Sequence, residues 1–293
     1  MSRQVFTAPF DSQKASRDWW EKSPMTYDWH GTLQYVPGSR EWFQEIDRRF
    51  LEAAYFARSE DGISFGRFLR PELVAGKRVL EIGCGMGLHA SLLARAGAKL
   101  TAIDLTRRAV EMAQRRFQMF ELPGIIQQAD AEHLPFHNGS FDVVWSWGVI
   151  HASSSTERCL QEITRVLREG GRLIFMVYYR PSIVYYFHCG FIRGVLFGQL
   201  LYRCLQDIYV AASDGLYARV FNKSELRALL DHSYERISMN VVGQKADLLP
   251  IPPSRLKTRL EKVIPDGLAS AILGHWGSMI VIEATKRTTR RAA

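Results

Sequence analysis

The chain has 293 residues, of which 47% are hydrophobic and 23% are charged, and its formal net charge is +8. This length and apolar content predict one large domain with additions and exclude a disordered chain. Four of the positive charges lie near the C-terminus, and no nucleic-acid-binding module is recognisable, so we expect no nucleic-acid partner.

Residues 1–75 contain no convincing strand and are rich in aromatic side chains. Residues 41–57 have helical composition, with Phe43, Ile46 and Phe50 spaced three and four apart. This part is predicted to form an N-terminal helical cap. The first ten residues lack a basic region followed by an apolar run, which predicts no signal peptide and a cytoplasmic location.

Alternating apolar strands and amphipathic helices are expected over residues 76–284. Strands are predicted at 78–82, 99–103, 125–129, 141–146, 172–178, 237–242 and 279–284. Helices are predicted at 88–95, 106–119, 156–168 and 222–230, with a further one between the last two strands. Thr106 and Asn222 are the expected N-caps, and the pair Gly170-Gly171 is expected to end the third helix.

Repeated strand–helix–strand units predict an α/β fold with a doubly wound, seven-stranded, mostly parallel sheet. Binding is then expected at the carboxyl ends of the strands. Residues 181–221 interrupt the pattern and are predicted to be a helical lid insertion, and residues 285–293 form a basic tail.

The insertion contains a mostly apolar stretch, residues 183–202, with Gly190, Gly194 and Gly198 at four-residue spacing. Arg193 at its middle disfavours a membrane span, so we expect a buried or interfacial helix over the binding pocket. Two partners stay open: a membrane surface touching residues 182–203, and a second copy of the chain packed through the glycines.

The four cysteines, Cys84, Cys159, Cys189 and Cys204, form no CxxC pair and no cluster with histidine at zinc-ligand spacing. We therefore expect reduced thiols and no metal ion.

A glycine loop follows the first predicted strand at Gly83, Gly85 and Gly87. Such loops permit tight turns and close approach of the backbone to a ligand. A nicotinamide-binding loop would place its third glycine three residues after the second, where this chain has Leu88. The spacing therefore disfavours a dinucleotide site.

Carboxylates lie on or directly after three successive strands. Glu81, two residues before the first glycine, suits a cationic ligand that carries an amino group. Asp104 has two acceptor oxygens for a ribose diol, and Asp130 can accept from an adenine amino group.

The stretch 79–87, Val-Leu-Glu-Ile-Gly-Cys-Gly-Met-Gly, resembles motif I of the class I (Rossmann-like) S-adenosylmethionine-dependent methyltransferases that act on small molecules. Asp104, the run 130–136, the run 141–144 and the run 165–173 match further landmarks of this family in the same order. The resemblance implies S-adenosylmethionine as the cofactor and methyl transfer as the reaction.

The resemblance also implies roles for residues at matching positions. The methionine part would lie on the glycine loop, near Glu81 and near backbone carbonyls after the fourth strand: Gly83, Cys84, Gly85, Gly87, Trp147 and Gly148. The ribose and adenine would lie at the ends of the second and third strands: Asp104, Leu105, Asp130, Ala131 and Glu132.

The acceptor side is less defined by the sequence. His151 is the candidate general base, with positioning of the following loop as the alternative. Tyr178 and Tyr179 are candidates for acceptor contact, with core packing as the alternative. Tyr27, Trp29 and His30 are expected to close over the cofactor and the substrate or to pack on the sheet.

The aromatic insertion predicts a small hydrophobic acceptor, such as an isoprenoid, a lipid-linked molecule or an aromatic natural product, methylated at carbon, oxygen or nitrogen. The alternatives are a methyltransferase acting on a sugar or polysaccharide precursor, and a non-catalytic S-adenosylmethionine-binding protein.

Overall fold

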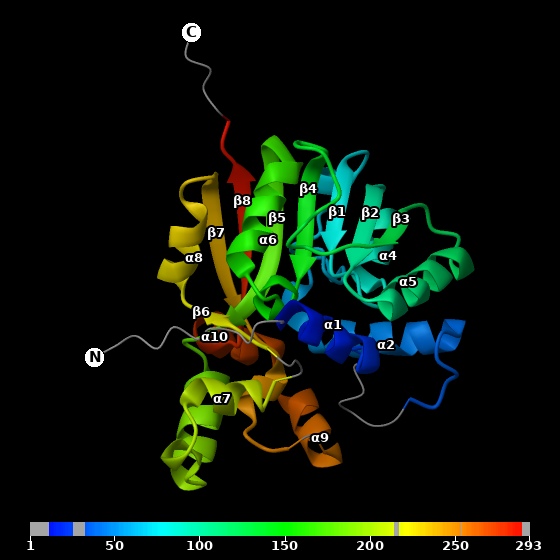
Figure 1. Ribbon diagram of the computed structural model, residues 1–293. Coiled ribbons are helices and arrows are strands. Elements are labelled where there is room, and N and C mark those ends of the chain that lie inside the picture. Colours follow the sequence, from blue (N-terminus) through cyan, green and yellow to red (C-terminus); the bar gives the residue numbers. More distant parts are fainter. Residues whose placement is uncertain (1–11, 26–32, 214–216, 253, 289–293) are drawn as a thin grey trace.

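A mixed β-sheet with helices on both faces forms the centre of the computed structural model (Figure 1). The structure describes residues 12–25, 33–213, 217–252 and 254–288. Tyr27, Trp29, His30 and the last five residues of the basic tail lie outside these ranges, so the lid prediction for the three aromatic residues stays untested.

Within the described residues the sheet has eight strands, in the order β3-β2-β1-β4-β5-β8-β7, with β6 paired to the end of β5. Only β8 runs antiparallel to its neighbours. The predicted mostly parallel α/β sheet is therefore confirmed, with a two-residue strand, β6, added. The strands are β1 Arg78–Ile82, β2 Lys99–Asp104, β3 Ile125–Gln128, β4 Phe141–Trp147, β5 Leu167–Tyr179, β6 Val220–Phe221, β7 Tyr234–Val242 and β8 Met279–Lys286.

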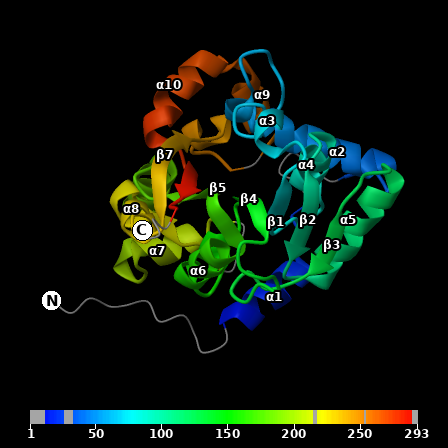
Figure 2. The same cartoon turned by 90° about the horizontal axis from the view of Figure 1, so that it is seen from above.

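Two hydrophobic cores lie on opposite faces of the sheet, because successive side chains of a strand point to opposite faces. On β1, Val79 packs with one core and Leu80 with the other, and both are fully buried. Helices α4 Leu88–Arg95, α5 Arg107–Met119 and α10 Asp266–Trp276 cover the first face. Helices α6 Thr156–Val166 and α8 Lys223–Leu230 cover the second (Figure 2).

The predicted helix caps are confirmed in detail. The Thr106 hydroxyl accepts from the Ala109 amide at the start of α5, and Asn222 and Glu225 form a capping box at the start of α8. Each cap satisfies backbone N–H groups that the first helical turn leaves without partners.

The end of α6 corrects the sequence prediction. The helix ends at Val166 rather than at residue 168, and β5 begins at Leu167 rather than at residue 172. Leu167 pairs with Phe141 and Arg172 with Val143, so the chain bulges between these two pairs, where Gly170 has a φ of +68°. The two glycines therefore lie inside a bulged strand instead of ending a helix.

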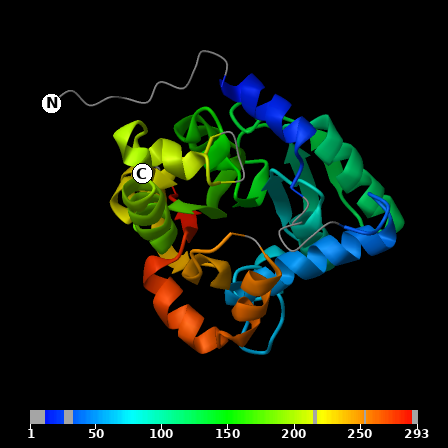
Figure 3. The same ribbon diagram turned by 90° about the horizontal axis from the view of Figure 1, so that it is seen from below.

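Helices from both ends of the chain lie at the carboxyl ends of the parallel strands (Figures 1 and 3). The predicted helix at 41–57 corresponds to α2 Arg40–Ala53 and the short η1 Tyr55–Ala57. Helix α1 Ser12–Lys22 was not predicted, and neither was α3 Pro71–Val74. Between β7 and β8 the structure has η5 Lys245–Leu248 and α9 Arg255–Val263 in addition to the one predicted helix.

The insertion forms a wide-turn π-helix, η3 Val184–Leu196, then η4 Gln199–Leu201 and α7 Leu205–Val210. Its glycines pack within the segment itself: a Cβ on Gly194 would lie 2.7 Å from Leu200, and Gly198 adopts a φ of +68° just after η3 ends. Among the described residues, no helix is both long enough and apolar enough to cross a membrane.

Candidate cofactor and acceptor site

A cavity of about 900 Å³ lies at the carboxyl ends of β1, β2 and β4, where binding was expected. It is lined on one side by the glycine loop and by the residues that follow these strands. Much of the rest is lined by residues of α1, α2, η1, β5, the insertion, η5 and α9. Eight of the expected cofactor-binding residues line it: Gly83, Cys84, Gly85, Asp104, Leu105, Ala131, Trp147 and Gly148.

Two glycines of the loop have different physical reasons for lacking a side chain. Gly83 has a φ of +75°, and a Cβ there would lie 2.2 Å from Val149. Gly85 has a φ of +50°, yet a Cβ there would meet no atom within 4 Å. Gly83 is thus required by packing of the loop against the residues after β4, whereas the open face of Gly85 adjoins the cavity.

Asp104 holds the glycine loop in place from the end of β2. Its Oδ2 accepts from the Gly85 amide at 3.0 Å, and its Oδ1 accepts from the Thr106 amide and hydroxyl at 2.9 and 2.8 Å. Burial raises the pKa of this carboxyl group, while these hydrogen bonds lower it. Asp104 therefore connects the loop to the start of α5 and also borders the cavity.

Glu81 is a buried acid with an unsatisfied oxygen. Its side chain is 1% exposed, and its Oε2 has no hydrogen-bond partner among the described residues. Burial, together with the nearby Asp104, raises its pKa to about 8. A buried acceptor of this kind is costly unless a donor reaches it, so the site fits a ligand with an amino group. The side chain itself is not among the residues that line the cavity.

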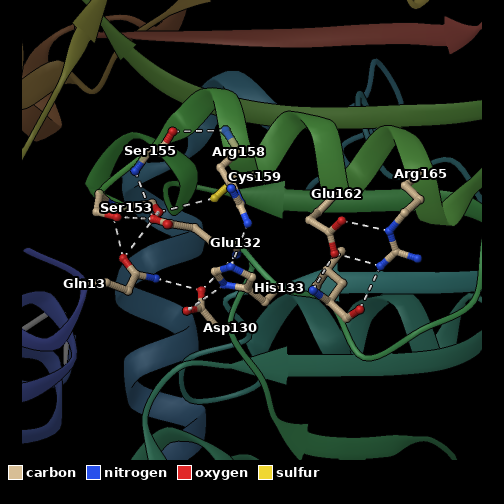
Figure 4. Close-up of polar contacts among 12 residues, drawn as sticks. Gln13, Asp130, Glu132, His133, Ser153, Ser155, Arg158, Cys159, Glu162 and Arg165 are labelled. Atoms are coloured by element: carbon tan, nitrogen blue, oxygen red, sulfur yellow. Dashed lines mark hydrogen bonds and ion pairs between the residues drawn. The ribbon is translucent and has the colours of Figure 1, made fainter.

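Asp130 and Glu132 belong to a polar network beside the cavity (Figure 4). The Asp130 Oδ1 accepts from the Glu132 amide and from the Gln13 side-chain amide of α1, at 2.9 and 2.8 Å. One Glu132 oxygen accepts from the Ser153 and Ser154 hydroxyls and from the Ser155 amide. Burial raises the pKa of Glu132, but these hydrogen bonds lower it by more, so the pKa is lowered overall. Neither carboxylate lines the cavity, and neither does Gly87, which is the N-cap of α4.

The end of β4 brings together an aromatic cluster that the sequence analysis missed. Trp147 stacks on Trp145 and packs edge-on against His89 and Phe65. His89 borders the cavity, its Nε2 has no partner among the described residues, and burial lowers its pKa to about 3. The sequence could have indicated His89 as a site residue, because it is the second residue of α4, the helix that directly follows the glycine loop.

His151 lies behind the cavity rather than on it. The ring is buried at 3% exposure, and its centroid is 4.1 Å from that of Tyr178, which does line the cavity. Burial lowers the pKa of His151 to about 3. A group with this pKa is a weak proton acceptor near neutral pH. Tyr179 is buried in the opposite core and does not border the cavity.

The cavity extends from the glycine loop to an apolar and aromatic side. Its apolar lining comes from α1, α2, η1, β5 and the insertion: Trp20, Phe50, Phe56, Tyr178, Val184 and Tyr209. Lys257, Thr258 and Glu261 of α9 add a polar wall. Among the described residues, no group of three or more His, Cys, Asp or Glu side chains is placed to hold a metal ion.

The fold and the site define the chain as a Rossmann-like domain that binds a nucleotide-containing cofactor. Residues 80–175 match the family model described as "Methyltransferase domain". This match covers about a third of the chain, and S-adenosylmethionine is the cofactor that a domain of this kind implies. The open face at Gly85, beside the cavity, fits the amino acid end of that molecule.

Two curated relatives share part of the sequence. The phthiotriol/phenolphthiotriol dimycocerosates methyltransferase of Mycobacterium leprae is 44% identical over 105 residues, which cover 35% of this chain and 38% of that protein. The methyltransferase GfsG of Streptomyces halstedii is 36% identical over 107 residues, which cover 36% of this chain and 38% of that protein. The likeness thus spans well under half of either relative.

Solved structures share the fold over most of the chain. One is a chain in the complex between the Haloferax volcanii Trm112 methyltransferase activator and a methyltransferase, with a TM-score of 0.57, 16% identity and coverage of 90% of this chain and 99% of that one. Another is the [4+2]-cyclase SpnF, with a TM-score of 0.51, 20% identity and coverage of 88% and 87%. These likenesses show the fold alone, since one fold supports different reactions.

Proposed function

We propose that this protein transfers a methyl group from S-adenosylmethionine to a small hydrophobic acceptor, a lipid or an apolar natural product. The observation that carries the proposal is the continuity of the cavity, which joins the glycine loop to the apolar side formed by Trp20, Phe50 and Tyr178. The names of the curated relatives, a dimycocerosates methyltransferase among them, support an acceptor of this class.

When bound, S-adenosylmethionine would supply an activated methyl group on a sulfonium centre. In the proposed arrangement the loop at Gly83–Gly87 and the unsatisfied Glu81 oxygen hold its amino acid end, and Asp104 with Leu105 holds the ribose side. Asp130 and Ala131 are assigned to the adenine, with Gln13 as the present partner of Asp130. Trp147 and Gly148 offer backbone carbonyls beside the amino group.

The chain's own contribution to the reaction would be alignment and exclusion of water. Fixing two reactants in one geometry accelerates a reaction without any general base. In place of a base, we assign His151 a positioning role: it packs behind the Tyr178 ring, which faces the acceptor side of the cavity. Two further proposals concern partners of the chain. One is contact with a membrane surface through residues 182–203, and the other is association with a second copy of the chain.

Titration calorimetry with S-adenosylmethionine, followed by a product assay, tests the proposal. Gly85→Leu should abolish measurable cofactor binding, because its side chain would fill the open face beside the cavity. Gly76→Leu is the matched control: Gly76 has a φ of +70°, also has open space around it and does not line the cavity. Equal loss of binding in both variants would refute the assignment.

The product assay incubates the protein with S-adenosylmethionine and pooled apolar extracts and searches by mass analysis for a product heavier by one methylene group. Cofactor binding without any such product, across apolar and sugar-containing pools, would favour a non-catalytic binding protein.

A further inference from the structure

The end of the molecule that contains the insertion has an unusual outward-facing surface. One side of η3 packs on α7 through Tyr185 and Cys189, which are buried with Ile208 and Tyr209. The rest of the η3–η4 tip, residues 186–202, exposes large apolar side chains to solvent. Leu201 is 90% exposed and Phe197 is 71% exposed. Soluble surfaces rarely gather so many exposed apolar residues without a partner.

Helix α9 shows the reverse of the usual amphipathic arrangement. Its more polar side, at Lys257, Thr258 and Glu261, lines the cavity. Its apolar residues, Leu256, Leu260 and Val263, follow the i, i+4, i+7 stripe of a helix and are exposed. A helix that turns its apolar stripe outward is matched to an apolar environment outside the protein.

These two surfaces lie at the same end of the molecule, below the sheet in Figure 1. The Lys257 ammonium of α9 contributes to lowering the pKa of His188 on η3, which shows that the two elements are within electrostatic range. Both also border the same cavity, η3 through Val184 and α9 through Lys257. They therefore surround the apolar side of the proposed active site.

The charge of this end is positive. Residues 180–206 contain three arginines and no Asp or Glu. Arg180 is paired with Glu225, whereas Arg193 and Arg203 form no ion pair with a carboxylate among the described residues. On α9, Arg255 and Arg259 are exposed and lie outside the cavity, whereas Lys257, Glu261 and Lys262 line it. Basic residues that flank exposed apolar side chains complement an anionic lipid surface.

We propose that the η3–η4 tip and the outer face of α9 together dock on the surface of an anionic bilayer, so that the cavity receives its acceptor from the membrane. The inference deepens the proposed function by naming the source of the acceptor. A second copy of this chain fits the surface less well, because symmetric packing would bring the basic residues of the two copies together.

Flotation of the full chain with vesicles tests the docking surface. Vesicles of phosphatidylglycerol and phosphatidylcholine in equal parts should retain the wild-type protein, and pure phosphatidylcholine should retain it less. The double variants Phe197→Ser with Leu201→Ser and Leu256→Ser with Val263→Ser should each lower retention on the mixed vesicles by ~10-fold or more. Added salt should weaken retention of the wild type.

A matched control replaces two exposed apolar residues elsewhere, Val36→Ser with Ile63→Ser, and should retain wild-type binding. None of the substituted residues lines the cavity, so calorimetry with S-adenosylmethionine should give the wild-type affinity in all three variants. This separates failure of docking from failure of the proposed function.

Three outcomes would overturn the docking proposal: no retention of the wild type, equal loss in the control variant, or a wild-type dimer that the tip variant converts to a monomer in light scattering. Retention on vesicles together with absent methyl transfer would leave the docking surface in place and overturn only the enzymatic role.

Discussion

His151, which is buried, and Tyr178, which is partly buried, form a ring pair whose order decides their roles. Of the two, only Tyr178 borders the cavity. The His151 ring lies behind it, and the two ring centroids are 4.1 Å apart. Because burial lowers the pKa of His151 to about 3, the imidazole is neutral at physiological pH and poorly suited to accept a proton. We propose that its contribution is the placement of Tyr178.

We therefore expect His151→Phe to lower kcat by about tenfold through a displaced Tyr178 ring, with an unchanged pH profile. The measurement is kcat/KM from pH 5 to pH 9 in both proteins, once an acceptor is in hand, and it samples the region above the pKa of about 3. Loss of an acidic limb near the ordinary pKa of histidine in the variant would restore His151 as the general base.

At the scale of elements, an ion pair between a buried arginine and a partly exposed aspartate joins the N-terminal cap to the central domain. Arg116 of α5 is 1% exposed and donates to both Asp47 oxygens of α2, at 2.8 and 3.0 Å. Its guanidinium also lies 4.5 Å from the centre of the Phe43 ring. The planar donor group of arginine thus fixes the angle between two helices that border the cavity.

Arg116→Met should lower the free energy of unfolding by about 3 kcal/mol, because it leaves the Asp47 carboxylate without its partner. Urea unfolding at neutral pH measures this. Arg107→Met is the control: Arg107 pairs with Glu111 on the same helix with both side chains exposed, so its loss should leave the free energy of unfolding nearly unchanged. Similar costs for both variants would contradict the structural role of the pair between Arg116 and Asp47.

The Gln13 side chain ties helix α1 to the loops that follow β3 and β4. The Gln13 amide nitrogen donates to Asp130, and its oxygen accepts from the Ser154 backbone amide at 3.1 Å (Figure 4). Ser16 and Trp20, on the same helix, also line the cavity. Gln13 therefore holds α1 over the region assigned to the adenine.

Gln13→Ala should raise the dissociation constant for S-adenosylmethionine by about fivefold, the equivalent of one neutral hydrogen bond of about 1 kcal/mol. Arg17→Ala, which changes an exposed residue of α1 that pairs with Asp18, should leave the affinity unchanged. Calorimetry compares the three proteins, and an unaltered affinity in Gln13→Ala would remove α1 from the cofactor site.

At the scale of the whole molecule, buried titratable groups of opposite kinds shape the pH dependence of stability. The folded pKa of His89 and of His151 is lowered to about 3, so stability is lost as pH falls below the ordinary value of 6.5. The folded pKa of Glu81 is raised to about 8 and that of Asp247 to about 6, so stability is lost as pH rises above their ordinary values of 4.5 and 3.8.

These opposed effects predict a plateau of stability between about pH 4.5 and 6, a decline below it from the histidines, and a decline from pH 6 to 8 from Glu81. Urea unfolding across this range without cofactor measures the profile. Glu81→Gln should remove an alkaline slope of up to about 1.4 kcal/mol per pH unit. An identical slope in the variant would contradict the protonated state assigned to Glu81.

The sequence by itself determined seven of the eight described strands and the glycine loop, since each depends on residues that are neighbours along the chain. The strand at Arg78–Ile82 and the helix at Leu88–Arg95 were predicted to the residue, because an apolar run, glycines and an amphipathic helix follow one another directly. The caps at Thr106 and Asn222 were found for the same reason.

Only the tertiary structure decided which side chains border the cavity and which lie behind it. Gln13 and Asp130 are 117 positions apart in the sequence, and Arg116 and Asp47 are 69 positions apart. No local sequence pattern predicts either pair. Likewise, composition showed that residues 183–202 are apolar, whereas folding decided that Tyr185 is buried and Phe197 exposed. Local periodicity fixes elements, but burial depends on which distant surfaces pack together.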